Sequence, residues 1–294
     1  MRSSAHERRP LVSVTSAFYN TGPFLLDMIK SVLAQTFQDW ELVLLDDGST
    51  DDSLEIARSV DDPRIRVFSN GRNLGRSASL NKLTDLARGK YIARMDSDDM
   101  CAPTRIETQL AYLEQHPEVD VLGTGIVYID RDNRPMGHSV AVCSHEEICK
   151  EPMRTFRILH PSIVARREWL ERFKYNESLP MSVDTDLFLR SYRHSTFANL
   201  AEVLFYYRLE TSFRLGKQLT ARRALARSLF AHYRESGRSG QAIWYAGMQY
   251  VKFAVTAAMF GLGMREGLMS RRFTPLSAEQ EAFYTHELET IHRL

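Results

Sequence analysis

Short apolar segments alternate with helix-like segments over residues 11 to about 100. The apolar segments, each near strand length and each ending in polar or acidic residues, are residues 11–17, 41–45, 65–68 and 91–95. Strands that alternate with helices along the chain are typical of a parallel α/β arrangement. We therefore predict an α/β fold with a mainly parallel central sheet flanked by helices.

Three helices are expected between these strands. Residues 22–35 place apolar side chains on one face, which predicts an amphipathic helix. A second helix should have Asp51 and Asp52 in its first turn, where carboxylates favour the positive end of the helix dipole. The third, residues 76–87, is expected to end at Gly89 in a left-handed cap.

After residue 100 the strict alternation is lost, so antiparallel additions to the sheet are expected. The predicted helices are residues 105–115 and 184–192, the predicted strands are residues 119–124, 127–129, 162–165 and 203–207, and residues 131–135 form a turn. We place the end of this compact α/β part near residue 212. Residues 213–294 are predicted to be a helical extension, with a long apolar segment at 242–264 and a last helix at 278–292.

The composition is that of a globular enzyme with one sizeable core and a smaller appendage, since 44% of the 294 residues are hydrophobic and 26% are charged. The three cysteines form no CxxC pair, which argues against a disulfide framework or a zinc ribbon and favours a reducing compartment. The polar amino terminus lacks the apolar run of a secretory signal. A cytoplasmic location is therefore expected.

Positive charge is concentrated in the last third of the chain. Between Arg214 and Arg272 there are eleven Lys or Arg residues and two acids, Glu235 and Glu266, a net charge of +9 in a chain of net charge +1. This part is expected to meet something anionic. Nucleic acid is not expected, because no recognised nucleic-acid module accompanies the charge.

Residues 242–264 are the most apolar stretch and are long enough to cross a bilayer, but Gln249 and Lys252 lie in the middle. A lysine at mid-membrane costs about 3 kcal/mol, so we expect an interfacial position on an anionic membrane surface, on the cytoplasmic face of the inner membrane. The alternative is a helical hairpin packed on the α/β domain or in a homo-oligomer interface.

Two acidic clusters directly follow predicted strands. They are residues 46–51, Asp-Asp-Gly-Ser-Thr-Asp, and residues 96–99, Asp-Ser-Asp-Asp. Ligands bind at the carboxyl ends of strands in an open α/β sheet, and crowded carboxylates favour a divalent cation with oxygen ligands. Such a cation would let an acidic pocket hold a diphosphate. Taken singly, either cluster is equally well explained as a turn with a helix cap or as a solvated loop.

Several segments together resemble glycosyltransferase family 2. They are residues 10–20, 31–37, 41–51, 73–76, 87–92 and 96–99, in this order and spacing. The resemblance spans roughly the first 210 residues. It implies a GT-A nucleotide-binding fold with a DxD motif, a UDP-, dTDP- or GDP-sugar as donor, and a divalent metal, Mn²⁺ or Mg²⁺.

The resemblance also implies positions that bind the nucleotide base. The backbone around Ala17 and the ring of Tyr19 are expected to flank the base, and Asp47 is expected to accept its imide N–H. For Tyr19 the alternative is packing in the core.

Asp96 and Asp98 correspond to the DxD carboxylates. Asp98 is the preferred metal ligand, and Asp96 is expected at the ribose, at a bridging water or as a second metal ligand. Asp99 is a candidate cap for a following helix. Arg76 is expected near base or phosphate, with a surface arginine as the alternative.

Residues 181–190 look like the family segment Glu-Asp-x-Asp/Glu-Leu-x-Leu-Arg, although Val183 replaces the usual first acid. Asp184 then corresponds to the catalytic base, which takes the proton of the acceptor hydroxyl during an inverting in-line displacement. Asp186 is the competing assignment. A purely structural role for Asp184 as a helix N-cap is the alternative.

Two further segments resemble parts of the family without a catalytic assignment. His160, in His160-Pro161-Ser162, borders the expected acceptor cavity and is a candidate contact to acceptor or phosphate. Tyr207-Arg208 resembles the end of the catalytic domain, so Arg208 is a secondary candidate at the site.

These patterns predict an inverting glycosyltransferase that moves a sugar, from a UDP-sugar by preference, to a hydroxyl of a glycan, lipid-linked or protein acceptor in envelope polysaccharide or exopolysaccharide assembly. One alternative is a sugar nucleotidyltransferase, which would normally carry a glycine-rich basic loop after the first strand, where this chain has residues 16–22. The other is a non-catalytic scaffold that binds nucleotide or glycan.

Overall fold

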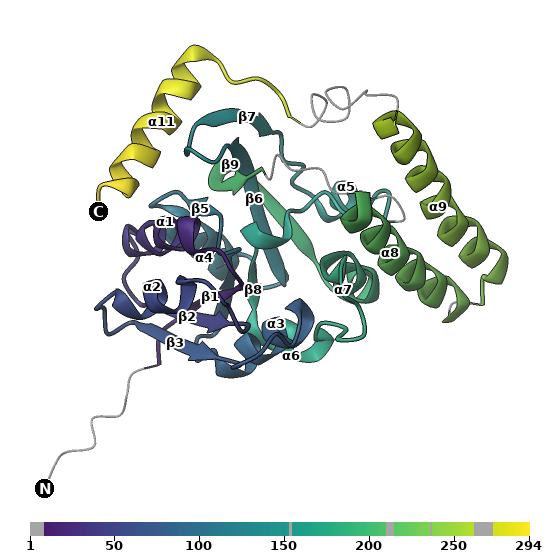
Figure 1. Ribbon diagram of the computed structural model, residues 1–294, viewed down its shortest axis with the longest axis horizontal. Helices are drawn as coiled ribbons and strands as arrows, with labels where there is room; N and C mark the ends of the chain where they lie inside the picture. The colour runs from purple at the N-terminus through teal and green to yellow at the C-terminus, as the bar shows by residue number, and fades with distance from the viewer. Residues whose placement is uncertain (1–8, 153–154, 210–214, 236, 262–272) are drawn as a thin grey trace, which may run out of the picture.

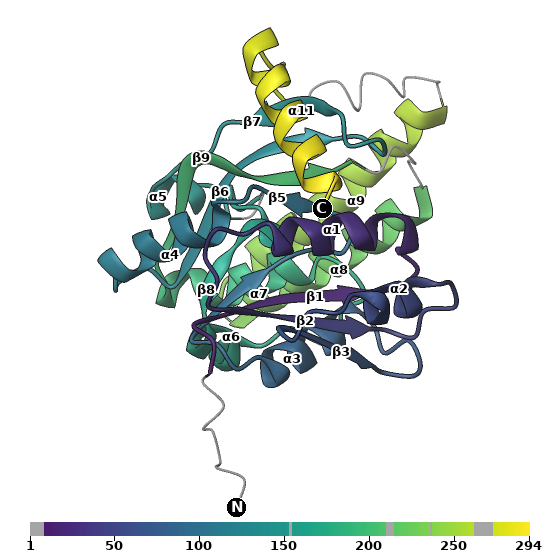
Figure 2. The same ribbon diagram turned by 90° about the vertical axis from the view of Figure 1, so that its left-hand side faces the viewer.

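The protein is described by a computed structural model that covers residues 9–152, 155–209, 215–235, 237–261 and 273–294. One sheet organises these residues, with strand order β3-β2-β1-β4-β8-β6-β9-β5 and with β7 paired to β6 (Figures 1 and 2). The predicted α/β class and the parallel first half are confirmed: β1 (Val12–Phe18), β2 (Trp40–Asp46), β3 (Ile65–Ser69) and β4 (Tyr91–Arg94) are mutually parallel.

The second half of the sheet mixes both directions. Its strands are β5 (Met100–Cys101), β6 (Val121–Ile129), β7 (Pro135–Ser139), β8 (Val164–Arg166) and β9 (Phe197–Arg208). The two strands predicted at 119–124 and 127–129 are one strand, β6. Its register against β9 shifts between Gly123 and Ile126, so the bulge interrupts the apolar pattern without ending the strand.

Helices cover both faces of the sheet. They are α1 (Gly22–Leu33), α2 (Ser53–Ser59), α3 (Arg76–Leu86), α4 (Arg105–Gln115), α5 (His145–Ile148), α6 (Arg167–Phe173), α7 (Val183–Ser191), α8 (Leu215–Glu235), α9 (Ser239–Gly261) and α11 (Ala278–His292), with 3-10 turns at His160–Ser162 and Tyr192–His194.

The prediction that Asp51 and Asp52 lie in the first turn of α2 is wrong. That helix begins at Ser53, and Asp51 instead accepts the Ser53 N–H and hydroxyl.

The sheet separates two apolar cores. Along β2, Leu42 and Leu44 pack with α1, α2 and α4, whereas Val43 and Leu45 pack on the other face with α3, α6, α7 and α8. Side chains alternate between faces along a strand, so a strand buried on both sides needs a continuous apolar run. The apolar run at residues 42–45 meets this requirement and identifies a central strand.

The carboxyl-terminal helices pack at two separate places (Figure 1). Helix α8 lies against α7, and α9 lies beside α8. Between α8 and α9 the rings of Tyr233 and Tyr245 stack, with their centroids 5.0 Å apart. Helix α11 places Leu288 and Ile291 in a third cluster with residues of β5, β6 and β9. This last helix therefore shares a core with strands of the sheet. The predicted boundary near residue 212 lies outside the described residues, and the division into two domains stays a prediction.

Gly89 does not have the left-handed conformation that we predicted for it. Helix α3 ends at Leu86 and passes into extended backbone at Ala87 (φ −65°, ψ 139°). A Cβ on Gly89 would lie 2.5 Å from the backbone N of Ser13 and 2.8 Å from the carbonyl carbon of Val12. Glycine is required here because the chain passes directly against β1.

We expect Gly89→Ala to lower the free energy of unfolding by about 2 kcal/mol, because the methyl group would have to displace backbone. Gly247→Ala is the matched control, since a Cβ at that position in α9 meets nothing within 4 Å. In a helix interior this replacement should raise stability by up to about 1 kcal/mol. Urea denaturation measures both, and equal effects would contradict the close-approach explanation.

Candidate active site

A cavity of about 390 Å³ lies between the carboxyl end of β4 and the first turn of α7. It is lined by Arg76, Asp96, Thr155, Phe156, Ile158, Leu159, His160, Pro161, Pro180, Met181, Ser182, Val183, Asp184, Thr185, Phe188 and Tyr207. Four residues selected from the sequence, Arg76, Asp96, His160 and Asp184, therefore share one cavity although they are far apart in the chain.

Three carboxylates crowd the loop between β4 and β5. Asp96, Asp98 and Asp99 each offer an oxygen within 4.8 Å of the others, a spacing suited to one metal ion. Burial, together with the negative charge of Asp96, raises the pKa of Asp98 above its ordinary value. Burial and the charges of Asp98 and Asp96 raise the pKa of Asp99 further. A cation would relieve this repulsion.

Asp96 is balanced by two arginines. Its Oδ1 accepts hydrogen bonds from Nη2 of Arg76 at 2.5 Å and from Nη2 of Arg94 at 2.6 Å. Burial alone would raise the pKa of Asp96, but the charges of Arg76 and Arg94 outweigh burial and hold that pKa far below its usual range. Asp96 is consequently ionised and already engaged, which leaves Asp98 as the stronger candidate for the cation.

Arg94 is the site residue that sequence reasoning missed. Its side chain is 3% exposed, and among the described residues its Nε and Nη1 atoms have no hydrogen-bond partner. A charged residue inside the apolar run at 91–95 was the available signal, because a buried guanidinium requires a nearby anion. That anion is Asp96, two residues later.

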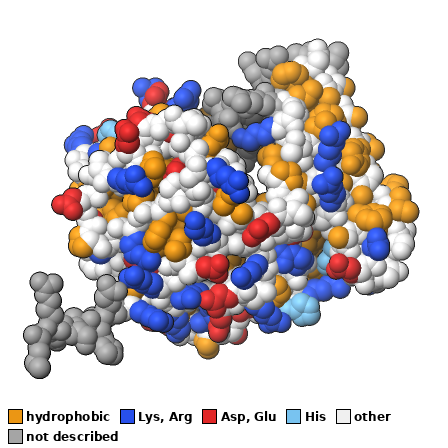
Figure 3. All heavy atoms as spheres, turned by 60° about the horizontal axis from the view of Figure 1, so that its bottom comes forward, with side chains coloured by type: hydrophobic (Ala, Val, Ile, Leu, Met, Phe, Trp, Pro, Cys, Tyr) orange, Lys and Arg blue, Asp and Glu red, His pale blue; other side chains and the backbone are white. Residues whose placement is uncertain are grey.

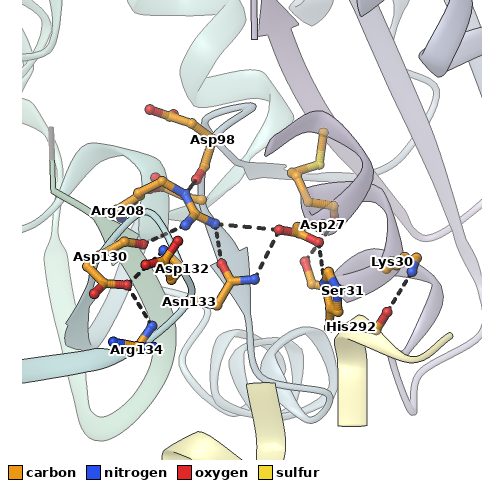
Figure 4. Close-up of polar contacts among 12 residues, drawn as sticks. Asp27, Lys30, Ser31, Asp98, Asp130, Asp132, Asn133, Arg134, Arg208 and His292 are labelled. Carbon is orange, nitrogen blue, oxygen red and sulfur yellow. Dashed lines mark hydrogen bonds and ion pairs between the residues drawn. The ribbon is translucent and has the colours of Figure 1, made fainter. Parts of the chain in front are cut away.

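Arg208 forms hydrogen bonds with the acidic loop (Figure 4). Its Nε donates to the backbone oxygen of Asp98 at 2.6 Å, and its Nη1 donates to the backbone oxygen of Asp130 at 2.6 Å. Its own backbone N–H donates to Oδ1 of Asp99 at 2.8 Å. The N-cap of the following helix, α4, is Thr104, so the predicted cap at Asp99 is wrong. The Asp98 side chain points away from Arg208. Arg208 therefore positions the loop from the side opposite that carboxylate.

The two acids in the first turn of α7 have different surroundings. Asp184 lines the cavity, whereas Asp186 is 5% exposed and forms an ion pair with Nε of Arg190 at 2.8 Å. The N-cap position of the helix is occupied by Ser182, so Asp184 is not an N-cap. Of the two carboxylates, Asp184 is the one that faces the cavity.

The residues expected at the base lie at the ends of β1 and β2. Tyr19 is 46% exposed, which excludes the core-packing alternative, and Ala17 is half-buried. Asp47 is buried and accepts the backbone N–H groups of Leu74 at 2.9 Å and Gly75 at 3.0 Å. It thus fixes the loop that leads into Arg76, a function that the sequence did not suggest. Its expected contact to the base stays a prediction.

His160 is buried in the floor of the cavity, where its Nε2 lies 2.8 Å from the hydroxyl of Tyr175. Burial, reinforced by the positive charges of Arg94 and Arg76, lowers the pKa of His160 well below its ordinary value. The imidazole is therefore neutral at physiological pH. It lies among the cavity residues without carrying charge.

A half-parallel sheet with an acidic loop at its carboxyl edge is the architecture of a GT-A transferase. Residues 13–174 match the family model described as Glycosyl transferase family 2. The chain belongs to glycosyltransferase family 2, and it is a glycosyltransferase.

Known proteins support this assignment. An uncharacterized glycosyltransferase of Methanocaldococcus jannaschii is 34% identical over 207 residues, which cover 68% of this chain and 71% of the relative. The crystal structure of S. aureus TarS 1-349 in complex with UDP-GlcNAc has a TM-score of 0.63 at 18% identity and covers 95% of this chain and 80% of its own. The mannosyltransferase PcManGT from Pyrobaculum calidifontis, in complex with GDP-Man and Mn²⁺, has a TM-score of 0.58 at 14% identity. The match covers 98% of this chain and 87% of PcManGT. At these identities the two structures show the fold alone.

We expect Arg208→Lys to lower the free energy of unfolding by about 3 kcal/mol, because an ammonium group cannot satisfy the carbonyl groups that the buried guanidinium reaches. The control is Arg293→Lys, since Arg293 is 76% exposed and pairs with Glu289 on the surface of α11. That change should cost less than about 0.5 kcal/mol. Chemical denaturation compares the two, and similar losses would argue against an anchoring role for Arg208.

His160 gives a pH prediction. Because its pKa is lowered on folding, the unfolded chain binds the proton first, so stability is complete above the unfolded pKa and falls as pH drops below about 6.5. The loss should approach about 1.4 kcal/mol per pH unit. His160→Gln should flatten this slope, whereas His286→Gln on the exposed surface of α11 should keep it. Denaturation midpoints at a series of pH values test both variants, and an unchanged slope for His160→Gln would refute the prediction.

Proposed function

We propose that this glycosyltransferase moves a sugar from a nucleoside-diphosphate sugar to an acceptor hydroxyl, with inversion at the anomeric carbon and with a divalent cation at the acidic loop. The observation that carries the proposal is one cavity that is lined by Asp96, Arg76 and Asp184. Transfer needs a group that meets the donor phosphates and a base that meets the acceptor oxygen within one cavity, because the acceptor oxygen attacks as the diphosphate leaves.

The residues at the acidic loop fit a cation. Three carboxylates offer oxygens within 4.8 Å of one another, and Mg²⁺ or Mn²⁺ prefers oxygen ligands. Asp98 is the main ligand in this proposal, because Asp96 already accepts two arginines. Asp96 is assigned to the ribose, to a bridging water or to a second metal contact. A bound cation would hold the two phosphates and stabilise the charge on the departing diphosphate.

Asp184 is the proposed base. Its carboxylate would take the proton of the acceptor hydroxyl as the new glycosidic bond forms and the bond to the diphosphate breaks. Arg76, whose guanidinium lies on the same cavity and is half-exposed, is positioned to meet a donor phosphate. Asp186 is the weaker candidate for the base because Arg190 already pairs with it.

The donor assignment favours a uridine nucleotide, with the backbone at Ala17, the ring of Tyr19 and the carboxylate of Asp47 at the base. The exposed ring of Tyr19 supports this, since a base stacks on an accessible aromatic surface. One structural neighbour carries UDP-GlcNAc and another carries GDP-Man. The binding experiment below therefore compares UDP, GDP and dTDP. The proposed acceptor is a glycan or a lipid-linked glycan in envelope polysaccharide or exopolysaccharide assembly.

We expect Asp98→Ala to weaken UDP binding in the presence of Mn²⁺ by more than about tenfold, because the phosphates would face uncompensated carboxylates. Asp184→Asn should bind UDP normally and lower kcat by about 10² to 10⁴. Calorimetry with UDP, GDP and dTDP, with and without Mn²⁺, measures binding, and release of the nucleoside diphosphate from the matching donor measures turnover.

The control is Asp186→Asn, a change of the same kind two residues along α7 at a position that does not line the cavity, which should retain turnover if circular dichroism shows it folded. Transfer at the wild-type rate by Asp184→Asn would rule out Asp184 as the base. Nucleotide binding that does not respond to Mn²⁺ in the wild type would rule out the cation.

A further inference from the structure

Helix α9 presents a continuous apolar stripe to its surroundings. Its exposed positions after residue 241 are Ile243, Trp244, Gly247, Tyr250, Val251, Ala254, Val255, Ala258 and Gly261. Their spacing follows the helical repeat, so they share one face over the length of the helix. Every one of them is uncharged, and the largest, Ile243 and Trp244, are 67% and 65% exposed. A face of this size and composition marks an interaction surface.

The opposite face of α9 attaches it to the protein. Ala242 and Gln249 are buried, and Oε1 of Gln249 accepts a hydrogen bond from Nη1 of Arg222 at 3.0 Å. Lys252, the single charged residue between Ser239 and Gly261, is half-buried and does not belong to the stripe. The lysine that disfavoured a membrane position in the sequence therefore does not interrupt the apolar surface.

A basic surface lies next to the stripe. The exposed positions of α8 and of the turn after it include Lys217, Arg223, Arg227, Arg234 and Arg238, with Glu235 as the exposed acid among them. In Figure 3 hydrophobic and Lys or Arg side chains gather side by side over this hairpin. We call the apolar stripe of α9 together with these basic residues of α8 the hairpin surface.

We propose that the hairpin surface docks on an anionic lipid bilayer, with α9 lying in the interface and the basic residues of α8 at the headgroups. Apolar side chains with tryptophan and tyrosine beside a row of arginines are the composition of helices that lie on anionic membranes. A second copy of the chain is the competing occupant. It would bring one basic row near another, which disfavours it, whereas negative headgroups complement that row. Among the described residues, no helix is both long and apolar enough to cross the bilayer.

The hairpin surface lies one helix away from the proposed base. Helix α8 packs on α7, which carries Asp184, and Oγ of Ser182 donates to the backbone oxygen of Ala221 at 3.2 Å. Docking would hold the cavity close to the membrane. If the proposed function is correct, this position selects acceptors presented at a lipid surface, such as lipid-linked glycans.

The experiment is flotation of the full chain with vesicles of phosphatidylcholine alone or mixed equally with phosphatidylglycerol. We expect the wild type to float with the anionic vesicles. Its partition coefficient for these vesicles should fall about tenfold or more in high salt. Val251→Glu with Val255→Glu, and separately Arg223→Glu with Arg227→Glu, should each weaken partitioning about tenfold or more. The control is Phe283→Glu, because Phe283 is 60% exposed on α11, outside the hairpin surface, and this variant should float like the wild type.

Two outcomes would overturn the proposal. One is the absence of membrane binding by this surface: the wild type does not float with anionic vesicles, or both double variants float as well as the wild type does. The other is a dimer by light scattering that Val251→Glu with Val255→Glu converts to a monomer without any vesicle binding, which would make the stripe a protein interface. Asp184→Asn separates this proposal from the proposed function, because it should float normally while losing turnover.

Discussion

The geometry of the site depends on the crowding of three carboxylates at the carboxyl edge of β4. Buried like charges repel one another, so the loop that carries Asp96, Asp98 and Asp99 keeps its shape only through nearby cations and donors. Arg76 and Arg94 neutralise Asp96, and Arg208 holds the loop backbone. This explains why β9 must return to the sheet, since its last residue supplies the donors that the loop requires.

The same requirement ties the carboxyl-terminal helix to the site (Figure 4). Nη2 of Arg208 donates to Oδ1 of Asn133 at 2.6 Å, and the amide of Asn133 donates to Asp27 on α1 at 3.0 Å. Asp27 in turn contacts Nδ1 of His292 on α11 at 2.7 Å. The chain of contacts runs from the acidic loop to the end of the last helix. Helix α11 is thus connected to the acidic loop, a link that its own sequence does not indicate.

The sequence predicted those helices and strands whose ranges are determined by neighbouring residues. The four parallel strands, α1, α4 and α11 lie within about two residues of their predicted ranges, because buried runs and helical periodicity are properties of neighbouring residues. The two-residue strand β5, the joined strand β6 and the full length of β9 depend on partners far away in the chain, which no local pattern records. For the same reason the sequence indicated Asp47 as a polar residue at a strand end but not the loop amides that it holds.

The net charge of +1 conceals two opposite electrostatic surfaces. At the acidic loop, negative charge is concentrated in a partly buried setting, so under the proposed function a diphosphate would need a cation there, with Arg76 offsetting part of the repulsion. At the hairpin of α8 and α9 the excess is positive and exposed, which suits an extended anionic surface and not a small ligand in a pocket. Helix α7 separates the two surfaces, because its first turn lines the cavity while α8 packs against it, so the two opposite charges are kept apart within one fold.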